Sequence, residues 1–223
     1  MLKWCHKKTD NLCFYCLDGN YAVGFNGIRS YDGPIYDFGY SFNVPVQEAV
    51  DAFEAGDSRK EASILDIEAW ATATSATFGI GYEHTGYYNR KYIARKGDQN
   101  MGDQNLTNPN NYRSIRFADV LLMAAESLNR GGVSDSRALT YLNRVRTRAG
   151  LPDVSFTGAN LTNAIYNERR VELVGEGHRF FDLVRTEQGS KIPGFTPNKN
   201  EVFPIPLIEI QLAGNRWEQN PGY

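Results

Sequence analysis

The feature that most constrains the fold is the helical spacing of apolar residues after residue 112. In residues 113–132, "RSIRFADVLLMAAESLNRGG", apolar side chains recur every three or four positions and the run stops at two glycines. This spacing predicts an amphipathic helix, with Ser114 as its N-cap. We expect its buried face to consist of Ile115, Val120, Leu121, Ala124, Ala125 and Leu128.

Three more helices are predicted in the rest of this half. Residues 134–149 are expected to form a helix that ends before Gly150 and buries Ala138, Leu139, Leu142 and Val145. Because only a few residues separate the first two helices, we expect them to pack as an antiparallel hairpin. A third helix is predicted over residues 160–174 and a fourth at "HRFFDLVRT", and the tail should form a helical turn around "PLIEIQLA".

Residues 1–112 form a loop-rich segment with many aromatic rings. Most of the 13 tyrosines lie here, mixed with Gly, Asn, Asp and Pro, which favour turns. Two exceptions are a predicted helix over residues 45–57 and a strand-like run over residues 85–97. The predicted fold is therefore mainly α with few short strands, as one domain with a loop-rich part, 1–112, and a helical part, 113–223.

Charge and hydropathy argue against two kinds of partner. The 24 basic and 26 acidic residues are interspersed and give a net charge of −2, so no basic surface for nucleic acid is indicated. Apolar runs such as "VLLMAA" are far shorter than the roughly 20 residues that cross a bilayer.

The N-terminal residues lack the pattern of a secretory signal and of a lipidation site, so we expect either a cytoplasmic protein or a chain whose true start is missing.

Three cysteines near the N-terminus raise the question of a metal or redox site. Cys5, His6, Cys13 and Cys16 could in principle supply four zinc ligands. No second C-x-x-C follows, and no βαβ pattern indicates a redox motif. We therefore interpret these cysteines as incidental apolar residues and expect no metal or cofactor.

The segment "NERRVELVGEGHRFFDLVR", residues 167–185, is dense in ionisable groups. Three glutamates are spaced by four, so on a helix they would share one side and repel unless cations lie between them. Apolar residues project from the same side, which places the carboxylates at the edge of a packed surface, where they need partners. We predict an ion-pair clamp that holds helices together and consists of Glu168, Arg169, Arg170, Glu172, Glu176, Arg179 and Asp182.

A catalytic role is the alternative interpretation of this segment. It would need a general acid and base beside a pocket, with a nucleophile, water or metal to act on. His178 is the single histidine of the segment and has no companion at metal-ligand spacing. We therefore predict no catalytic residues.

Aromatic and polar residues alternate in "YDGPIYDFGY" and "GYEHTGYYNRKY". A carbohydrate site needs flat rings flanked by amide, carboxylate or guanidinium groups, and these stretches contain both. Composition alone favours a plainer interpretation, in which tyrosines merely cover a loop-rich surface. As ligand-binding candidates, selected for ring size and for polar, Gly-rich surroundings, we name Trp4, Tyr31, Tyr36 and Trp70.

Five motifs, in one order along the chain, resemble the C-terminal region of the SusD/RagB family of outer-membrane glycan- and nutrient-binding lipoproteins. They are "IRFADVLLMAAESLN", "ALTYLNRVRTRAGLP", "AIYNERRVELVGEGHRFFDLVR", "FPIPLIEI" and "QNPGY". Two upstream segments, "VPVQEAVDAFEAGDSR" and "TGYYNRKYI", resemble the family as well. The resemblance covers roughly residues 40–223.

The resemblance implies a fold of tetratricopeptide-like helix pairs, an incomplete α-α superhelix, with residues 113–149 as one pair and loops that hold the ligand. It implies a non-catalytic protein on the surface of the outer membrane that binds oligosaccharide or another nutrient. The partner that it implies is a TonB-dependent transporter of the SusC type. Family members are usually more than twice this length, with a secretion signal, a lipidated cysteine and an N-terminal helical region, so we expect a C-terminal fragment, an internal start or a truncated product.

Two other functions stay open from the residues alone. An interaction scaffold would bind a protein partner on a helical face. A glycoside hydrolase would need two carboxyl groups about 5 to 10 Å apart across an open cleft, which a sequence cannot place. Glycan binding is the leading hypothesis.

Overall fold

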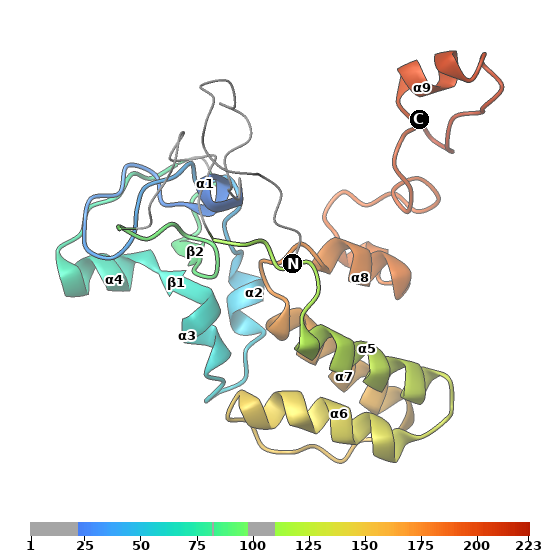
Figure 1. Ribbon diagram of the computed structural model, residues 1–223, viewed down its shortest axis with the longest axis horizontal. Helices are drawn as coiled ribbons and strands as arrows, with labels where there is room; N and C mark the ends of the chain where they lie inside the picture. The colour runs from blue at the N-terminus through green and yellow to red at the C-terminus, as the bar shows by residue number, and fades with distance from the viewer. Residues whose placement is uncertain (1–21, 82, 98–109) are drawn as a thin grey trace, which may run out of the picture. The chain divides into compact units, whose positions relative to one another are not determined.

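The described part of the chain divides into two compact units. The computed structural model describes residues 22–81, 83–97 and 110–223 (Figure 1). The first unit extends to Glu176 and the second comprises Gly177–Tyr223, and each is considered by itself. The described residues are mainly helical with two short strands, which confirms the predicted fold class. The predicted division at residue 112 falls inside the first unit.

Three helices form a bundle in the first unit. α5 (Phe117–Arg130) and α6 (Asp135–Arg148) make the predicted hairpin, and α7 (Gly158–Glu172) packs against both (Figure 1). α6 begins after Ser134, whose side chain accepts a hydrogen bond from the Arg137 N–H and caps the helix. The bundle core consists of Ala118, Leu121, Leu122, Ala125, Ala138, Leu142, Val145, Leu161 and Ile165.

The start and the buried face of α5 differ from the prediction. Ser114 does not cap the helix, because α5 begins at Phe117 and is preceded by Arg116 in an extended conformation. Val120 is 43% exposed, although it was predicted to be buried. Each residue turns a helix by about 100°, so packing Leu122 into the core carries Val120 to the outer face. Ile115 lies before the helix and is exposed as well.

Short elements alternate with loops before the bundle. They are α1 (Ala22–Asn26), α2 (Gln47–Asp51), α3 (Arg59–Ser63), β1 (Ile64–Asp66), α4 (Ile67–Thr74) and β2 (Tyr87–Asn89). β1 and β2 pair antiparallel, with Ile64 opposite Asn89. The strand predicted over residues 85–97 is thus reduced to the three residues of β2.

The helix predicted over residues 45–57 is only partly formed. α2 ends at Asp51 and the chain continues in turns, in which the Phe53 N–H bonds to the Val50 carbonyl at 3.5 Å. These turns bury Phe53 in a small cluster with Val50, Ile64 and Val171. Long-range packing, not helical periodicity, sets the position of Phe53.

A second core lies within the loop-rich part. It consists of Ile28, Tyr31, Tyr36, Leu65, Ile67, Ala76, Tyr88 and Ile93. Two backbone segments cross in contact at its edge, where a Cβ added to Gly27 would lie 2.6 Å from the Gly39 Cα. Only glycine fits such a crossing. This core and crossing fix the loops that carry the aromatic residues.

The second unit contains α8 (Arg179–Arg185), a 3-10 helix (Gly189–Lys191) and α9 (Leu207–Leu212). α8 and α9 coincide with the predicted fourth helix and with the helical turn of the tail. Within this unit the Phe180 ring packs against Phe181 and Phe203, with centroid separations of 5.5 and 6.0 Å. Of the helices in the described ranges of both units, none is long and apolar enough to span a membrane.

Candidate functional site

Trp70 rests on two tyrosines. It lies on α4, which begins after Asp66, whose carboxylate accepts a backbone hydrogen bond from the first turn and caps the helix. The Trp70 Nε1–H donates to the Tyr31 hydroxyl at 2.9 Å, and that hydroxyl donates to the Pro34 carbonyl at 2.7 Å. The centroids of the Tyr36 and Trp70 rings are 5.3 Å apart. These contacts fix the orientation of the indole ring.

The three rings differ in exposure. Tyr36 is fully buried and Tyr31 is 8% exposed, whereas Trp70 is half-buried at the edge of the second core. The structure therefore brings three of the four predicted ligand residues together, with Trp70 as the accessible ring and the tyrosines as its support. Their contact with a ligand stays a prediction, and Trp4 lies outside the described residues.

A second aromatic group was not selected from the sequence. The Phe42 ring stacks on Phe25 and on Tyr40, with centroids 6.1 and 5.6 Å away. The Arg29 guanidinium lies 5.9 Å from the Phe42 centroid, and its Nη2 donates to the Tyr40 carbonyl at 2.6 Å. We call these four residues the Phe42 shelf, since Phe42 is 66% exposed. The alternation of Tyr40 and Phe42 with Ser41, whose hydroxyl bonds inward to Tyr88, was the signal that could have revealed it.

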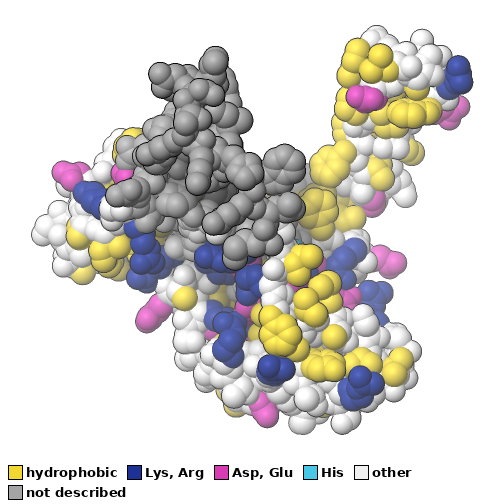
Figure 2. All heavy atoms as spheres, in the orientation of Figure 1, with side chains coloured by type: hydrophobic (Ala, Val, Ile, Leu, Met, Phe, Trp, Pro, Cys, Tyr) yellow, Lys and Arg dark blue, Asp and Glu magenta, His cyan; other side chains and the backbone are white. Residues whose placement is uncertain are grey.

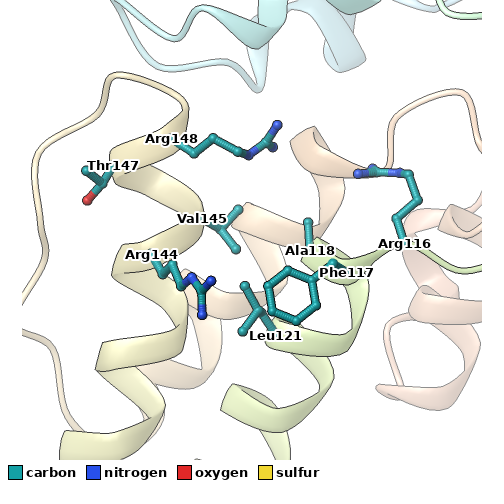
Figure 3. Close-up of a pocket in the computed structure, with 8 residues that line it drawn as sticks. All are labelled: Arg116, Phe117, Ala118, Leu121, Arg144, Val145, Thr147 and Arg148. Carbon is teal, nitrogen blue, oxygen red and sulfur yellow. The ribbon is translucent and has the colours of Figure 1, made fainter.

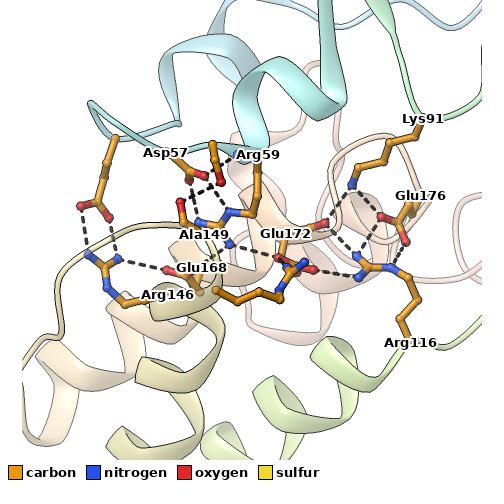
Figure 4. Close-up of polar contacts among 12 residues, drawn as sticks. Asp57, Arg59, Lys91, Arg116, Arg146, Ala149, Glu168, Glu172 and Glu176 are labelled. Carbon is orange, nitrogen blue, oxygen red and sulfur yellow. Dashed lines mark hydrogen bonds and ion pairs between the residues drawn. The ribbon is translucent and has the colours of Figure 1, made fainter.

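The three predicted clamp glutamates take part in one buried ion-pair network (Figure 4). Glu168 and Glu172 lie on α7, and Glu176 lies in the turn that follows. Their side chains are at most 2% exposed. The cations that bind them come from other elements and are Arg59, Lys91, Arg116, Arg146 and Arg148.

Arg59 links α3 to α7. Its Nη1 contacts Glu168 Oε1 at 2.6 Å and Glu172 Oε2 at 3.1 Å. Its Nε and Nη2 donate to the two oxygens of Asp57 at 2.8 and 2.6 Å. A guanidinium suits this role because its planar fork presents several donors at fixed angles.

Arg116 occupies the other end of the network. Its Nη1 lies 2.7 Å from Glu172 Oε1, and its Nε lies 2.7 Å from Glu176 Oε2. The Lys91 Nζ also binds Glu176, at 2.6 Å from Oε1. The residue just before α5, a loop lysine and the turn after α7 are thus tied to one carboxylate.

The predicted cations of the segment itself lie elsewhere. Arg169 pairs with Asp119 of α5, and Arg170 donates to the Glu48 carbonyl at 2.8 Å. They follow Glu168 by one and two residues and therefore project in other directions around α7. Within the second unit, α8 carries Arg179, and Asp182 pairs with Arg185.

The turn that holds Glu176 depends on glycine. Gly175 has a φ of 74°, which L side chains rarely adopt, and a Cβ there would lie 2.3 Å from the Asn89 Nδ2. The same amide donates to the Gly175 carbonyl at 2.9 Å and to Asn26 Oδ1 at 3.1 Å. The "VGEG" sequence thus lets the chain leave α7 and return a carboxylate to the network.

Burial and pairing act in opposite directions on the carboxyl groups. Burial raises the pKa of Glu168 above its ordinary value, in spite of the opposing charges of Arg59 and Arg146. For Glu172 burial also acts to raise the pKa, but the hydrogen bond from Arg116 and the charge of Arg148 outweigh it and lower the pKa. The pKa of Glu176 is lowered in the same way, by Arg116 and Lys91.

This arrangement favours a structural role over acid–base chemistry. A hollow of about 290 Å³ is lined by three carboxylates, Glu54, Asp57 and Glu168, but each of them binds Arg146 or Arg59. A general acid or base needs a carboxyl group that is available to substrate. No group of three or more potential metal ligands occurs within the described ranges.

Comparison with known proteins gives a consistent result. A sequence profile described as the SusD family matches residues 18–194. SusD-like protein P2 of Formosa agariphila is 31% identical over 231 residues, which cover 92% of this chain and 45% of that protein. SusD-like protein P25 of the same organism is 38% identical over 113 residues, which cover 44% of this chain and 21% of that protein.

Solved structures show the same likeness. A laminarin binding SusD-like protein is 41% identical with a TM-score of 0.81, over 92% of this chain and 44% of that one. Surface glycan-binding protein A from Bacteroides fluxus is 31% identical with a TM-score of 0.78, over 92% of this chain and 46% of that one. Surface glycan-binding protein A from Bacteroides thetaiotaomicron was solved in complex with laminarihexaose. It is 28% identical with a TM-score of 0.76, over 89% of this chain and 46% of that one. The chain spans about half the length of these relatives.

Proposed function

The chain belongs to the SusD family, and from this premise we propose that it binds oligosaccharide without catalysing a reaction. Laminarin is the first ligand to test. The observation that carries the proposal is the 41% identity and TM-score of 0.81 to a laminarin binding SusD-like protein over 92% of the chain. The laminarihexaose complex of a second neighbour, with a TM-score of 0.76, supports the same ligand class.

We assign the main stacking role to Trp70. A sugar ring has an apolar C–H face that packs on a flat aromatic surface, and the indole is both partly accessible and held in place by Tyr31 and Tyr36. A ring whose orientation is fixed before binding loses little conformational entropy when the sugar arrives. In this proposal Tyr31 and Tyr36 position Trp70, and Trp4 stays a candidate from the sequence.

The Phe42 shelf offers a second apolar surface for sugar rings. Its exposed Phe42 ring lies beside the Arg29 guanidinium, so an apolar face and hydrogen-bond donors occur together. Carbohydrate sites combine these two properties. We propose that the shelf adds contacts to an extended oligosaccharide.

The state of the acidic residues supports binding over hydrolysis. Glu168, Glu172 and Glu176 are buried and bound to cations, so they are poorly suited to protonate a glycosidic oxygen or to attack a sugar. By family membership we further propose that the protein acts on the surface of the outer membrane and passes its ligand to a TonB-dependent transporter of the SusC type.

Affinity electrophoresis tests this proposal. The protein is run through native gels that contain laminarin, starch or xylan, and retardation by laminarin is expected. Trp70→Ala should raise the dissociation constant for laminarin, obtained from the retardation at several glycan concentrations, about 10-fold. Burying an aromatic face contributes on the order of 1.5 kcal/mol or more. Phe156→Ala, which removes an aromatic ring that is 45% exposed, is the control. Mobility that none of the glycans changes would refute the proposed function.

A further inference from the structure

An open hollow of about 740 Å³ lies between the start of α5 and the end of α6 (Figure 3). Its floor is apolar and is formed by Ala118, Leu121 and Val145. The Phe117 ring forms one wall and is 63% exposed. The volume is in the range of about 300 to 1,000 Å³ that is usual for small-molecule sites.

Three guanidinium groups surround this floor. Figure 3 shows Arg116 and Arg148 projecting from opposite sides, with Arg144 lower down beside Phe117. On the face in Figure 2, basic side chains and exposed apolar side chains lie together over α5 and α6. An apolar floor with basic groups at its edge suits a ligand that has an apolar body and a negative charge.

The three arginines differ in what already binds them. Arg116 directs its donors to Glu172 and Glu176. The Nη2 of Arg148 lies 2.6 Å from Glu172 Oε2, and the Arg148 side chain is 58% exposed. Arg144 makes no ion pair within the described ranges, and its guanidinium lies 5.0 Å from the Phe117 centroid.

The side chains of the network and the hollow include one more cation than carboxylates. Arg59, Lys91, Arg116, Arg146 and Arg148 face the carboxylates of Glu54, Asp57, Glu168, Glu172 and Glu176. Arg144 is therefore a positive charge without a carboxylate in this group. It also lies one helical turn from Arg148, so the two repel unless an anion lies between them.

We propose that this hollow binds a small monocarboxylate with an aromatic body. The carboxylate lies between the guanidinium of Arg144 and the free donors of Arg148, which match its geometry as a planar fork. The aromatic body packs on Phe117 and on the apolar floor. One uncompensated positive charge matches one carboxylate better than it matches a doubly charged phosphate. The site is separate from Trp70 and does not depend on the proposed function.

Calorimetric titration with a matched pair of probes tests the proposal. Phenylacetate carries the carboxylate, and phenylacetamide has the same shape without the charge. We expect phenylacetate to bind at least about 10-fold more tightly, because hydrogen bonds to an ionised group are roughly twice as strong as neutral ones. Arg144→Gln should reduce this affinity about 10-fold, and Phe117→Leu should weaken both probes.

Arg137→Gln is the matched control, since Arg137 is exposed on the same helix and does not line the hollow. It should change affinity less than about twofold. Equal binding of the two probes, an unchanged affinity of Arg144→Gln, or no binding of either probe at millimolar concentration overturns the proposal. A dimer that Arg144→Gln dissociates also overturns it, because the hollow would then be an interface between copies of the chain.

Discussion

Replacing Arg59 by methionine removes the link between α3 and α7. The Arg59 side chain is 8% exposed and binds Asp57, Glu168 and Glu172. Methionine retains much of the volume but leaves Asp57 buried without a side-chain cation. Removing one partner of a buried ion pair typically costs about 3 to 5 kcal/mol. We expect a loss of about 4 kcal/mol, since Glu168 and Glu172 keep other guanidinium partners.

Urea denaturation followed by circular dichroism measures this loss. With a slope of about 2 kcal/mol per molar urea, a loss of about 4 kcal/mol lowers the midpoint by about 2 M. Lys60→Met is the matched control, because Lys60 is the next residue of α3 and is exposed. A surface substitution of this kind usually changes stability by less than about 0.5 kcal/mol.

A second variant separates the orphaned charge from the lost contacts. Asp57→Asn in the Arg59→Met background removes the unpaired carboxylate and keeps an oxygen that accepts the backbone N–H of residue 59. It should recover about 1 to 2 kcal/mol. If Arg59→Met unfolds at the wild-type urea concentration, or if Lys60→Met is equally damaging, the network does not hold α3 to α7 and our reasoning about the clamp is wrong.

Two further predictions concern the same network. The pKa values of Glu172 and Glu176 are lowered from 4.5, so their contribution to stability is present above that pH and lost as pH falls through the lowered values. Glu172→Gln removes one of the two carboxyl groups that cause this loss, so its urea midpoint should fall less steeply below pH 4.5 than that of the wild type. Glu168, whose pKa is raised, contributes with the opposite sign in both proteins. Gly175→Ala should cost about 2 to 4 kcal/mol, since it adds a steric clash to an unfavourable φ. Gly56→Ala, with a φ of 83° and open space around it, should cost only about 1 kcal/mol in the same urea titration.

The helices after residue 112 could be predicted because their signal is local. Apolar spacing and the stop at Gly150 depend on neighbours within a few turns, and α6 follows both. The predicted buried face of α5 was wrong at Val120 for a physical reason. Val120 and Leu122 are both apolar, and only contact with the other helices decides which one is buried.

The network shows where sequence reasoning ends. The spacing of Glu168 and Glu172 on one helix side indicated that they need cations. It could not identify Arg59, which lies 109 residues from Glu168, or Lys91, which lies 85 residues from Glu176. Pairings at such separation follow from the packing of the two cores and have no local pattern.

The aromatic residues could be predicted less well than the helices but better than the ion pairs. Ring chemistry selected Tyr31, Tyr36 and Trp70, and the structure places all three in one group. Their division into one accessible ring and two buried supports depends on the second core, which periodicity does not reveal. Phe42 was missed because its signal, the alternation with Ser41 and Tyr40, is only three residues long and lies in a loop, where no strand was predicted.

Titration of the protein with laminarihexaose, followed by chromatography of the recovered sugar, tests the central claim most directly. We predict saturable binding, a large loss of affinity in Trp70→Ala, and recovery of the hexasaccharide at its original length. Trp70→Phe, which keeps a ring but lacks the N–H that binds Tyr31, should show an intermediate affinity. The absence of binding, or recovery of shorter sugars, would contradict the account of a non-catalytic glycan-binding protein.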